Sequence, residues 1–374
     1  MRIKNILASV LRNVNNVPGW STKRKIVVIE SDDWGSIRLP SKDVYQKFIK
    51  RGFNVENSQY NRYDALESND DVVSLFEVLR KHKDSLGHAP CVTANTIVAN
   101  PDFDRIEKSG YQQYHYEHFT ETLKRYPQHN RVFELYQEGL KAGLFKPQFH
   151  GREHVQANRW LAALRKADEN MVFAFSCGTT YSGKGDYNFM ESFDWDSPQE
   201  VISQQDILRD GLQLFHKTFG YASTSFIAPC YTWDSRLEPT LVAEGVKYMQ
   251  GGMNQYIPKG GFENYEKKKY RMGEESNGLT YLTRNCFFEP SLVSKPDWID
   301  YTLASVRDAF RWNKPAIICA HRINFIGFID ESNRTRNLKM LNELLRRILM
   351  TWPDVEFMSS DQLGELMTKD TLSV

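Results

Sequence analysis

The stretch K-I-V-V-I-E-S-D-D-W-G-S, from Lys25 to Ser36, decides the fold. An apolar, β-branched run leads into two adjacent acids, Asp32 and Asp33, and a glycine follows two residues later. This pattern predicts a buried strand ending in an open turn, with carboxylates at the edge where α/β barrels and open α/β sheets do chemistry. Because adjacent side chains of a regular strand point to opposite faces, the two acids share a site only if the strand bends, and Gly35 favours a bend. A solvated Asp-Asp turn without chemistry is the alternative for this stretch taken alone.

Length and composition fit one large α/β domain, residues 1–374, with an N-terminal helix and an insertion at about 40–85. Hydrophobic residues make up 41% of the chain, enough for a sizeable core, and the formal net charge of +1 argues against nucleic acid as a partner. The five cysteines are widely spread without a C-x-x-C pattern, which favours reduced core cysteines over a disulfide framework.

The N-terminal segment carries apolar residues at helical spacing, namely Ile3, Ile6, Leu7, Val10, Leu11 and Val14. Its apolar run is short for a signal peptide, and no stretch of the chain approaches the roughly 20 apolar residues that span a membrane. We therefore expect a cytoplasmic protein without a transmembrane segment, whose first helix docks on the domain. Peripheral contact with a membrane surface is a less favoured use of the same helix face.

The rest of the chain alternates strand-like and helix-like segments about seven times. The predicted strands are 25–30, 91–98, 171–177, 223–231, 246–252, 279–288, 315–321 and 355–360, and the clearest helices are 70–81, 131–145, 155–167, 199–219, 234–245, 298–312 and 333–350. Residues 260–270 are predicted to form a basic loop. The alternation predicts a parallel sheet, wound right-handedly and closed or nearly closed into a barrel.

Three predicted strand ends carry polar groups that packing alone does not explain. They are Asp32 and Asp33, His150 and His154 in F-H-G-R-E-H, and His321 in C-A-H-R. If a helical turn begins at Gly151, both imidazoles of the second motif lie on one face and reach a single ion. Asn95, near the end of the second strand, is within reach of the same edge, although a turn role is favoured for it.

Two histidines and one carboxylate form a common three-ligand catalytic metal site that leaves positions open for water and substrate. Such ligands suit Zn²⁺, and also Co²⁺, Ni²⁺ or Mn²⁺. A second carboxylate beside the metal is suited to act as general base, and a separate histidine to protonate the leaving group. The alternative for each histidine is structural, a satisfied core residue for His321 and surface residues for His150 and His154.

These motifs resemble those of the polysaccharide deacetylase family, also called the NodB-homology or carbohydrate esterase family four domain. The family motifs, in chain order, are T-F-D-D, H-S/T-x-x-H, R-x-P-Y, D-x-x-D-W and L-x-L-x-H. Here E-S-D-D-W-G, H-G-R-E-H, A-P-C-Y, K-P-D-W and I-I-C-A-H stand in those places, between Lys25 and about Leu366.

The resemblance implies a distorted (β/α) barrel of about seven parallel strands with insertions. It also implies a metal-dependent carbohydrate deacetylase that acts on an N- or O-acetylated sugar or polysaccharide with metal-bound water as nucleophile. By the same resemblance Asp32 is the general base, His321 the general acid, and Asp33, His150 and His154 are the ligands of a divalent metal, with Zn²⁺ as first choice.

The sequence departs from the family pattern at the third motif. The arginine that steadies the base falls at Ile227, so Arg152 and Arg322 are candidate replacements. Cys230 replaces the tyrosine that follows the motif proline, but a backbone N–H survives this change and can still stabilise an oxyanion.

The fourth motif also departs, because its first acid falls at Ser294. The acid partner of His321 is therefore expected among Asp297, Glu289 and the F-D-W-D loop, which carries Asp194. The residues predicted to contact the substrate are Trp34, Arg152, Pro229, Cys230, Tyr231, Arg284 and Glu289. A structural pair between Arg284 and Glu289 is the alternative for those two.

Two other functions remain open from the sequence. One is a glycoside hydrolase that uses two carboxylates on a related barrel and needs no metal. The other is a carbohydrate-binding barrel that has lost activity, which the missing motif arginine and tyrosine suggest. The sequence identifies neither the sugar and acyl group nor the oligomeric state.

Overall fold

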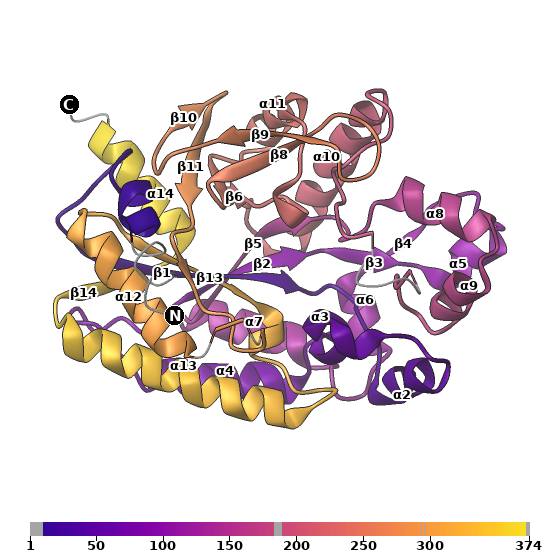
Figure 1. The fold of residues 1–374 in the computed structure, drawn as a ribbon, viewed down its shortest axis with the longest axis horizontal. Coiled ribbons are helices and arrows are strands. Elements are labelled where there is room, and N and C mark those ends of the chain that lie inside the picture. Colours follow the sequence, from indigo (N-terminus) through magenta and orange to yellow (C-terminus); the bar gives the residue numbers. More distant parts are fainter. Residues whose placement is uncertain (1–9, 183–188, 293, 296, 372–374) are drawn as a thin grey trace.

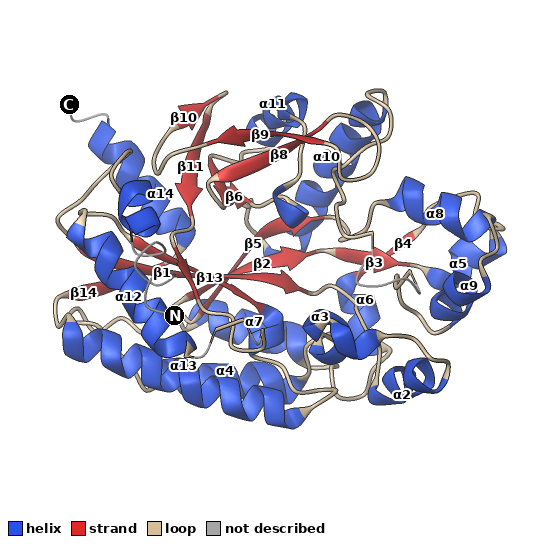
Figure 2. Ribbon diagram, in the orientation of Figure 1, coloured by secondary structure: helices blue, strands red, loops and turns tan. Residues whose placement is uncertain are grey.

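The computed structural model describes residues 10–182, 189–292, 294–295 and 297–371. A curled sheet of ten strands forms its centre, and every strand except β10 runs parallel to its neighbours (Figures 1 and 2). Its strands are β1 (Lys25–Trp34), β2 (Val92–Ile97), β5 (Phe145–Gly151), β6 (Ser225–Phe226), β7 (Tyr248–Gly251), β10 (Glu275–Ser276), β11 (Leu279–Thr283), β12 (Cys286–Phe287), β13 (Ala316–His321) and β14 (Val355–Met358). The order across the sheet is β10-β11-β7-β6-β5-β2-β1-β13-β12, with β14 beside β1. The predicted parallel sheet and distorted (β/α) barrel are confirmed.

The sheet closes into a barrel where the connection between β11 and β12 bonds the strands on both sides of the opening. β11 and β12 lie near opposite ends of the strand order and form no ladder with each other among the described residues. The chain instead passes directly from one to the other: the Arg284 N–H donates to the Gly251 carbonyl of β7 at 2.8 Å, and the Asn285 N–H to the Ile317 carbonyl of β13 at 3.3 Å. The single strand predicted over 279–288 is therefore two strands on either side of the opening.

The helices lie around the sheet and beyond its carboxyl edge, and the last of them closes the lower end of the barrel (Figure 1). They are α2 (Lys42–Lys50), α3 (Gln59–Tyr63), α4 (Asn69–Arg80), α5 (Phe103–Lys108), α6 (Phe119–Lys124), α7 (Val132–Lys141), α8 (Ala157–Arg165), α9 (Glu169–Ser176), α10 (Glu200–Phe219), α11 (Glu238–Ala243), α12 (Trp298–Arg311), α13 (Glu331–Thr351) and α14 (Ser360–Thr371). Two small antiparallel sheets pair β3 (Ala99–Pro101) with β4 (Tyr116–His118), which α5 separates in the chain, and β8 (Asn254–Pro258) with β9 (Tyr265–Lys269). In the largest core cluster, Val27 and Ile29 of β1 pack with Leu75 of α4, Leu135 of α7 and Leu345 of α13.

The inner face of the sheet changes from apolar to polar along β1. Ile26 and Val28 point inward, where Leu363 and Met367 of α14 fill the lower end of the barrel. Because side chains alternate along a strand, the next inward residues after Val28 are Glu30 and Asp32. The upper end of the barrel therefore receives charged groups at the carboxyl edge of the sheet, where the chemistry was predicted.

Two predicted elements are wrong. The apolar run 171–177 forms helix α9 and not a strand, because Asp168 caps it by accepting the Asn170 and Met171 N–H groups and its apolar residues pack against α8. A short continuous apolar run does not by itself distinguish a strand from a buried helix. The predicted basic loop forms β9, where Lys267 and Lys268 lie over the rings of Tyr256 and Tyr270.

The N-terminal helix is only partly described, and residues 10–16 are helical. The prediction that its apolar face docks on the domain is wrong for Val10, Leu11 and Val14, which are each more than half exposed. Polar contacts attach this segment instead, with Arg12 Nε 2.9 Å from Asp308 Oδ2. The remaining apolar positions of the predicted helix lie outside the described residues. No helix in the described part of the chain is both long and apolar enough to cross a bilayer.

Gly35 is required where β1 turns away from the sheet. Its φ is +77°, and a Cβ there would lie 2.6 Å from the Ile97 carbonyl oxygen. Gly87 has a similar φ of +87° but nothing within 4 Å of a Cβ, so it controls for the backbone strain alone. We expect Gly87→Ala to cost about 1 kcal/mol and Gly35→Ala about 2–4 kcal/mol in free energy of unfolding, measured by equilibrium denaturation. Equal costs for the two variants would contradict the close packing of this turn.

Candidate metal centre and its acid–base groups

Asp32 and Asp33 reach the same site because β1 is distorted at its end. Asp33 has a φ of +75°, and the register between β1 and β2 shifts between Ser31 and Trp34. The distortion turns Asp33 to the side on which Asp32 already points. The predicted bend is therefore present, and it begins at Asp33, before Gly35. Trp34 leaves the site: it is fully buried, donates Nε1–H to Ser31 Oγ at 3.0 Å and packs on Phe145, so it has no access to a substrate.

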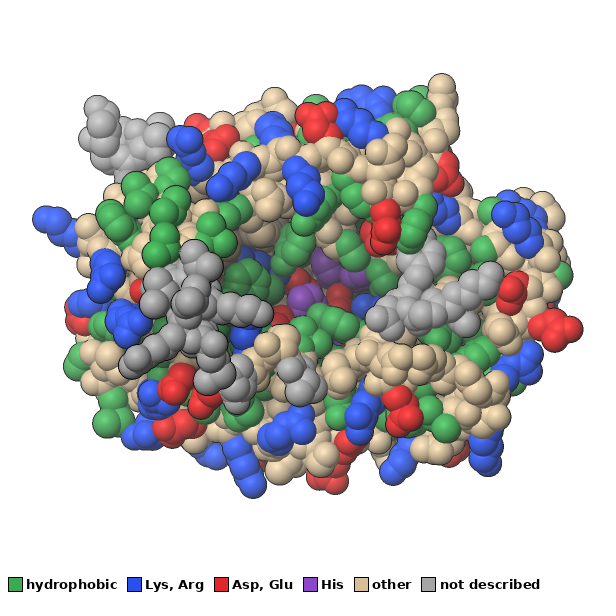
Figure 3. Space-filling view, in the orientation of Figure 1, with side chains coloured by type: hydrophobic (Ala, Val, Ile, Leu, Met, Phe, Trp, Pro, Cys, Tyr) green, Lys and Arg blue, Asp and Glu red, His purple; other side chains and the backbone are tan. Residues whose placement is uncertain are grey.

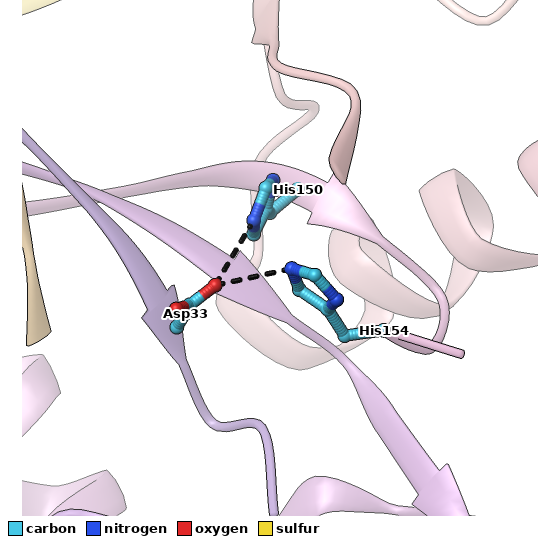
Figure 4. Close-up of side chains that lie close together, drawn as sticks. All are labelled: Asp33, His150 and His154. Carbon is cyan, nitrogen blue, oxygen red and sulfur yellow. Dashed lines mark ion pairs between the residues drawn. The ribbon is translucent and has the colours of Figure 1, made fainter. Parts of the chain in front are cut away.

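Asp33, His150 and His154 converge on one point, as predicted for the metal ligands (Figure 4). Asp33 Oδ1 lies 3.4 Å from His150 Nε2 and 3.1 Å from His154 Nε2. All three side chains are buried, and their ligand atoms lie within 4.8 Å of one another. Two imidazoles and a carboxylate at this separation match the donor set of a catalytic divalent metal.

The state of the two imidazoles fits a metal. His150 Nδ1 lies 2.9 Å from the Ile227 carbonyl oxygen, and since a carbonyl only accepts, Nδ1 carries the proton and Nε2 presents its lone pair. That buried Nε2 has no hydrogen-bond partner among the described residues. Burial lowers the pKa of His154 to about 4, so this imidazole is neutral near pH 7, the form that binds metals.

The local conformation around the two histidines differs from the predicted helical turn. His150 lies on β5, Gly151 is the last residue of that strand with a φ of +144°, and His154 lies in the loop before α8. A residue in that conformation cannot begin an α-helix, whose φ is near −60°. The two rings meet, with centroids 5.1 Å apart, because the chain turns back after the strand.

Arg284 holds Asp32. Its Nη1 donates to Asp32 Oδ2 and its Nη2 to Asp32 Oδ1, both at 2.7 Å, in a bidentate pair. Asn95 Nδ2 donates to Asp32 Oδ1, also at 2.7 Å, so Asn95 serves the site and not a turn. Burial alone would raise the pKa of Asp32, but the charge and hydrogen bonds of Arg284 lower it below its usual range.

A second carboxylate supports this arginine from below. Arg284 Nε donates to Glu30 Oε2 at 2.6 Å, and Ser360 Oγ donates to Glu30 Oε1 at 2.7 Å. Arg284 and Glu30 are both fully buried. The predicted substrate contact of Arg284 and its alternative pairing with Glu289 are therefore both wrong. Arg284 fills the role of the arginine missing at Ile227.

The two arginines proposed as replacements serve elsewhere. Arg152 pairs with Glu153 and with Asp210 Oδ2, the latter at 2.9 Å, and does not line the cavity, which also removes it from substrate binding. Arg322 is buried with Asp64 and Glu67.

His321 is paired with Glu289, one of the acids predicted for this role. His321 Nδ1 lies 2.6 Å from Glu289 Oε1, and Asn324 Nδ2 donates to Glu289 Oε2 at 2.6 Å. His321 Nε2 is 3.7 Å from Asp32 Oδ2. Burial disfavours the imidazolium, but Glu289 and Asp32 outweigh it and raise the pKa of His321 to about 10. Glu289 is buried and positions His321, so we withdraw its predicted contact with substrate.

The other two candidate partners of His321 lie elsewhere. Asp297 caps α12 by accepting the Asp300 N–H at 2.9 Å. Asp194 pairs with Arg159 and accepts the Trp195 N–H at 2.8 Å. Both acids accept hydrogen bonds from nearby backbone N–H groups and so have local structural roles.

Glu289, Cys319 and His321 form a second cluster of metal-binding residue types. The Nδ1 of His321 is already bonded to Glu289, and the raised pKa of His321 keeps the ring protonated. A protonated imidazole has no lone pair for a metal. This cluster is therefore less suited to a metal than the cluster at Asp33.

One cavity of about 400 Å³ connects these groups. Figure 3 shows the hollow, with histidine and acidic side chains at its floor. Its lining residues are Asp32, Asp33, Arg38, Ser58, Tyr60, His150, His154, Met190, Glu191, Ile227, Ala228, Cys230, Tyr231 and His321. Of the predicted substrate contacts, Cys230 and Tyr231 line this cavity, while Pro229 is buried behind them in the same short turn.

Sequence reasoning missed Glu30, Arg38, Ser58, Tyr60 and Glu191. Glu30 carried a signal, because a glutamate within an apolar strand requires a buried partner. Its spacing of two from Asp32 also places both on one strand face. Arg38, Ser58 and Glu191 lie on connecting segments and Tyr60 on the short helix α3, and nothing in their local sequence indicates the cavity.

Comparisons with known proteins bear on the fold. No family model matches the chain, and no curated protein matches it. A Parabacteroides distasonis structure, provisionally described as a glycoside hydrolase/deacetylase, matches with a TM-score of 0.51 and 8% identity over 93% of this chain and 72% of that one. A Mycobacterium smegmatis structure, provisionally described as a polysaccharide deacetylase, matches with a TM-score of 0.45 and 11% identity over 95% of this chain and 94% of that one. The Thermococcus litoralis 4-alpha-glucanotransferase matches with a TM-score of 0.43 and 11% identity over 91% of this chain. The matched part is only 40% of that enzyme's length. The first match confirms the fold that the motifs implied.

Removing Arg284 is expected to leave two buried carboxylates without their counter-charge. We expect Arg284→Met to lower the free energy of unfolding by about 3–5 kcal/mol in equilibrium denaturation. Arg346→Met is the matched control, because Arg346 is exposed and pairs with Glu343 at the surface, and it is expected to change the free energy of unfolding little. Similar losses in the two variants would contradict the central position of Arg284.

Glu289 is expected to set the pKa of His321. In Glu289→Gln the negative partner of the imidazolium is lost, so its proton leaves at lower pH, and the pKa should fall from about 10 toward the ordinary value of about 6.5. NMR titration of the ring protons measures the change. Asp297→Asn is the control and should leave the titration in place. An unshifted titration in Glu289→Gln would refute the pairing.

Proposed function

We propose that the protein is a metal-dependent hydrolase that removes an acyl group, most simply acetyl, from an N- or O-acylated sugar. The observation that carries this proposal is the convergence of three different groups on one cavity. These groups are the metal set of Asp33, His150 and His154, the arginine-bound Asp32, and the glutamate-bound His321.

A divalent cation held by Asp33, His150 and His154 would polarise the acyl carbonyl and lower the pKa of a water molecule. Zn²⁺ is our first choice for this site, with Co²⁺, Ni²⁺ and Mn²⁺ as alternatives that the same ligands accept.

Asp32 and His321 divide the proton transfers between them. Asp32 stays ionised beside Arg284 and accepts the proton of the attacking water as its oxygen bonds to the acyl carbon. His321 is kept protonated by Glu289 and donates from Nε2 to the sugar nitrogen or oxygen as the bond to the acyl carbon breaks. Two neighbouring groups whose environments push their pKa values apart are the usual mark of an acid–base pair. The Cys230 backbone N–H at the cavity wall is our candidate donor to the developing oxyanion.

Two observations support a sugar as the substrate. The fold is similar to that of the P. distasonis protein provisionally described as a glycoside hydrolase/deacetylase. Tyr60 and Tyr231 line the cavity, and their rings offer apolar faces of the kind that sugars stack on.

A two-carboxylate glycoside hydrolase is the competing enzyme class, because the match covers both chemistries by name. That mechanism requires a carboxylic acid and a carboxylate on either side of the bond and no metal. In this cavity the position opposite Asp32 belongs to a histidine. A barrel that binds sugar without catalysis is weakened as an alternative, because Arg284 replaces the missing motif arginine.

Two variants are expected to distinguish loss of the metal from loss of the general base. Asp32→Asn should keep the metal and lose about 10²–10⁴-fold in the rate of acetate release, because only the base is removed. His150→Ala should lose both metal and activity, and so should the wild-type protein after treatment with a chelator. Elemental analysis and acetate release from acetylated sugars measure the two properties.

His88→Ala is the control for the histidine change, since His88 is exposed and distant from the cavity lining. Full activity in Asp32→Asn would show that Asp32 is not the general base. An undiminished rate after complete metal removal would favour the two-carboxylate mechanism.

A further inference from the structure

Arg38 lies on one wall of the cavity, near two carboxylates that it does not hold by well-aligned hydrogen bonds. Its Nη2 is 3.8 Å from Asp33 Oδ2 and its Nε is 3.2 Å from Asp64 Oδ2, but it donates no hydrogen bond of good geometry among the described residues. Its side chain is only 12% exposed. A guanidinium this deeply buried ordinarily uses its donors, so the idle donors of Arg38 are a feature that requires a function.

Both carboxylates near Arg38 have other partners. Asp64 accepts from Arg322 Nε at 3.2 Å and from Arg322 Nη2 at 3.0 Å, so its charge is shared between two guanidinium groups. Asp33 faces the two imidazoles of the metal set, and its charge would be engaged there. Arg322 has a second carboxylate in Glu67 at 2.8 Å, whereas the Arg38 guanidinium keeps donors without a well-aligned acceptor among the described residues.

Two hydroxyl groups extend the same wall. Ser58 and Tyr60 line the cavity beside Arg38, and no hydrogen-bond partner is found for either hydroxyl in the described part of the chain. The Arg38 guanidinium lies 5.8 Å from the centre of the Tyr60 ring, and that ring meets His321 edge-on at 5.6 Å. The wall thus runs from the metal set to the general acid and offers a guanidinium and two hydroxyls to a ligand oxygen.

The other charged groups of the cavity lining are the carboxylates and the imidazolium of His321, which Glu289 already pairs. Asp32 and Glu191 line its other parts, and Glu191 has a buried oxygen without a hydrogen-bond partner. An anionic substituent of a substrate would be repelled at Glu191 and attracted at Arg38, away from the groups assigned to the reaction itself. The cavity therefore discriminates by charge and also fixes the side on which the charge lies.

We propose that Arg38, with Ser58 and Tyr60, selects acylated sugars that carry an anionic group, a carboxylate or a phosphate, close to the acyl group that is removed. This inference rests on the proposed function and names its substrate class. The guanidinium forms a charge-assisted, two-pronged contact with the anion, and the hydroxyls donate to its remaining oxygens.

Equilibrium binding tests the proposal without turnover. The zinc-loaded Asp32→Asn protein is titrated by calorimetry with neutral N-acetylglucosamine, with its 6-phosphate, and with N-acetylmuramic acid, which carries a carboxylate. We expect at least one of the two anionic sugars to bind about tenfold or more tightly than the neutral one. The phosphate and carboxylate arms then identify which anion the wall prefers.

The added substitution Arg38→Gln should abolish that preference, whereas Arg62→Gln should retain it. Arg62 lies on α3 beside Tyr60, carries the same charge and does not line the cavity. Should Arg38→Gln not fold, Arg38→Lys replaces it. Because lysine keeps the charge but loses the two-pronged contact, the preference should then fall by about threefold.

Three outcomes overturn the proposal. The first is equal affinity for neutral and anionic sugars, and the second is a preference that survives the change at Arg38. The third is a loss of zinc together with an equal loss of affinity for all three sugars, because Arg38 would then only orient Asp33. Failure of the proposed function is a separate result, namely no acetate release by the wild-type protein from any of these sugars.

Discussion

The bidentate pair between Arg284 and Asp32 is the interaction on which the rest of the site depends. The sheet is open between β11 and β12, and Arg284 lies at that opening, where the chain crosses from one strand to the other. From there its side chain reaches β1 and bonds both Asp32 and Glu30 inside the barrel. One guanidinium thus ties the opening of the sheet to β1 and fixes Asp32 beside Asp33. This gives a physical reason why a charged group tolerates complete burial here.

The same strand supplies the barrel floor and the reactive groups. Ile26 and Val28 bury their side chains against α14, and the next two inward positions carry Glu30 and Asp32. The apolar floor keeps water away from the carboxylates, so their energies are set by a few fixed partners. Asp32 is held ionised by an arginine and His321 is held protonated by a glutamate, although the two side chains lie 3.7 Å apart. The opposed preferences of these neighbours make proton transfer in two directions feasible in one small cavity.

Local patterns in the sequence predicted the metal set, and long-range pairing was beyond them. Strand ends and histidine spacing are properties of short stretches, so Asp33, His150 and His154 were predicted together, although by a helical turn that Gly151 does not form. The partner of Asp32 lies 252 residues away, and only the topology shows that Arg284 reaches it. The apolar run of α9 was predicted as a strand because a short run without polar interruptions has no readable period. Trp34 was predicted to contact the substrate because the residue types around it do not indicate the distortion at Asp33. That distortion turns the Trp34 side chain into the core.

The most direct test of the account is the location of a bound metal, by anomalous scattering from crystals grown with Zn²⁺. The account predicts one ion bonded to Asp33, His150 and His154, with Asp32 still paired to Arg284 and outside the coordination sphere. An ion held by Glu289, Cys319 and His321, or no ion at the Asp33 set in crystals saturated with zinc, would contradict it.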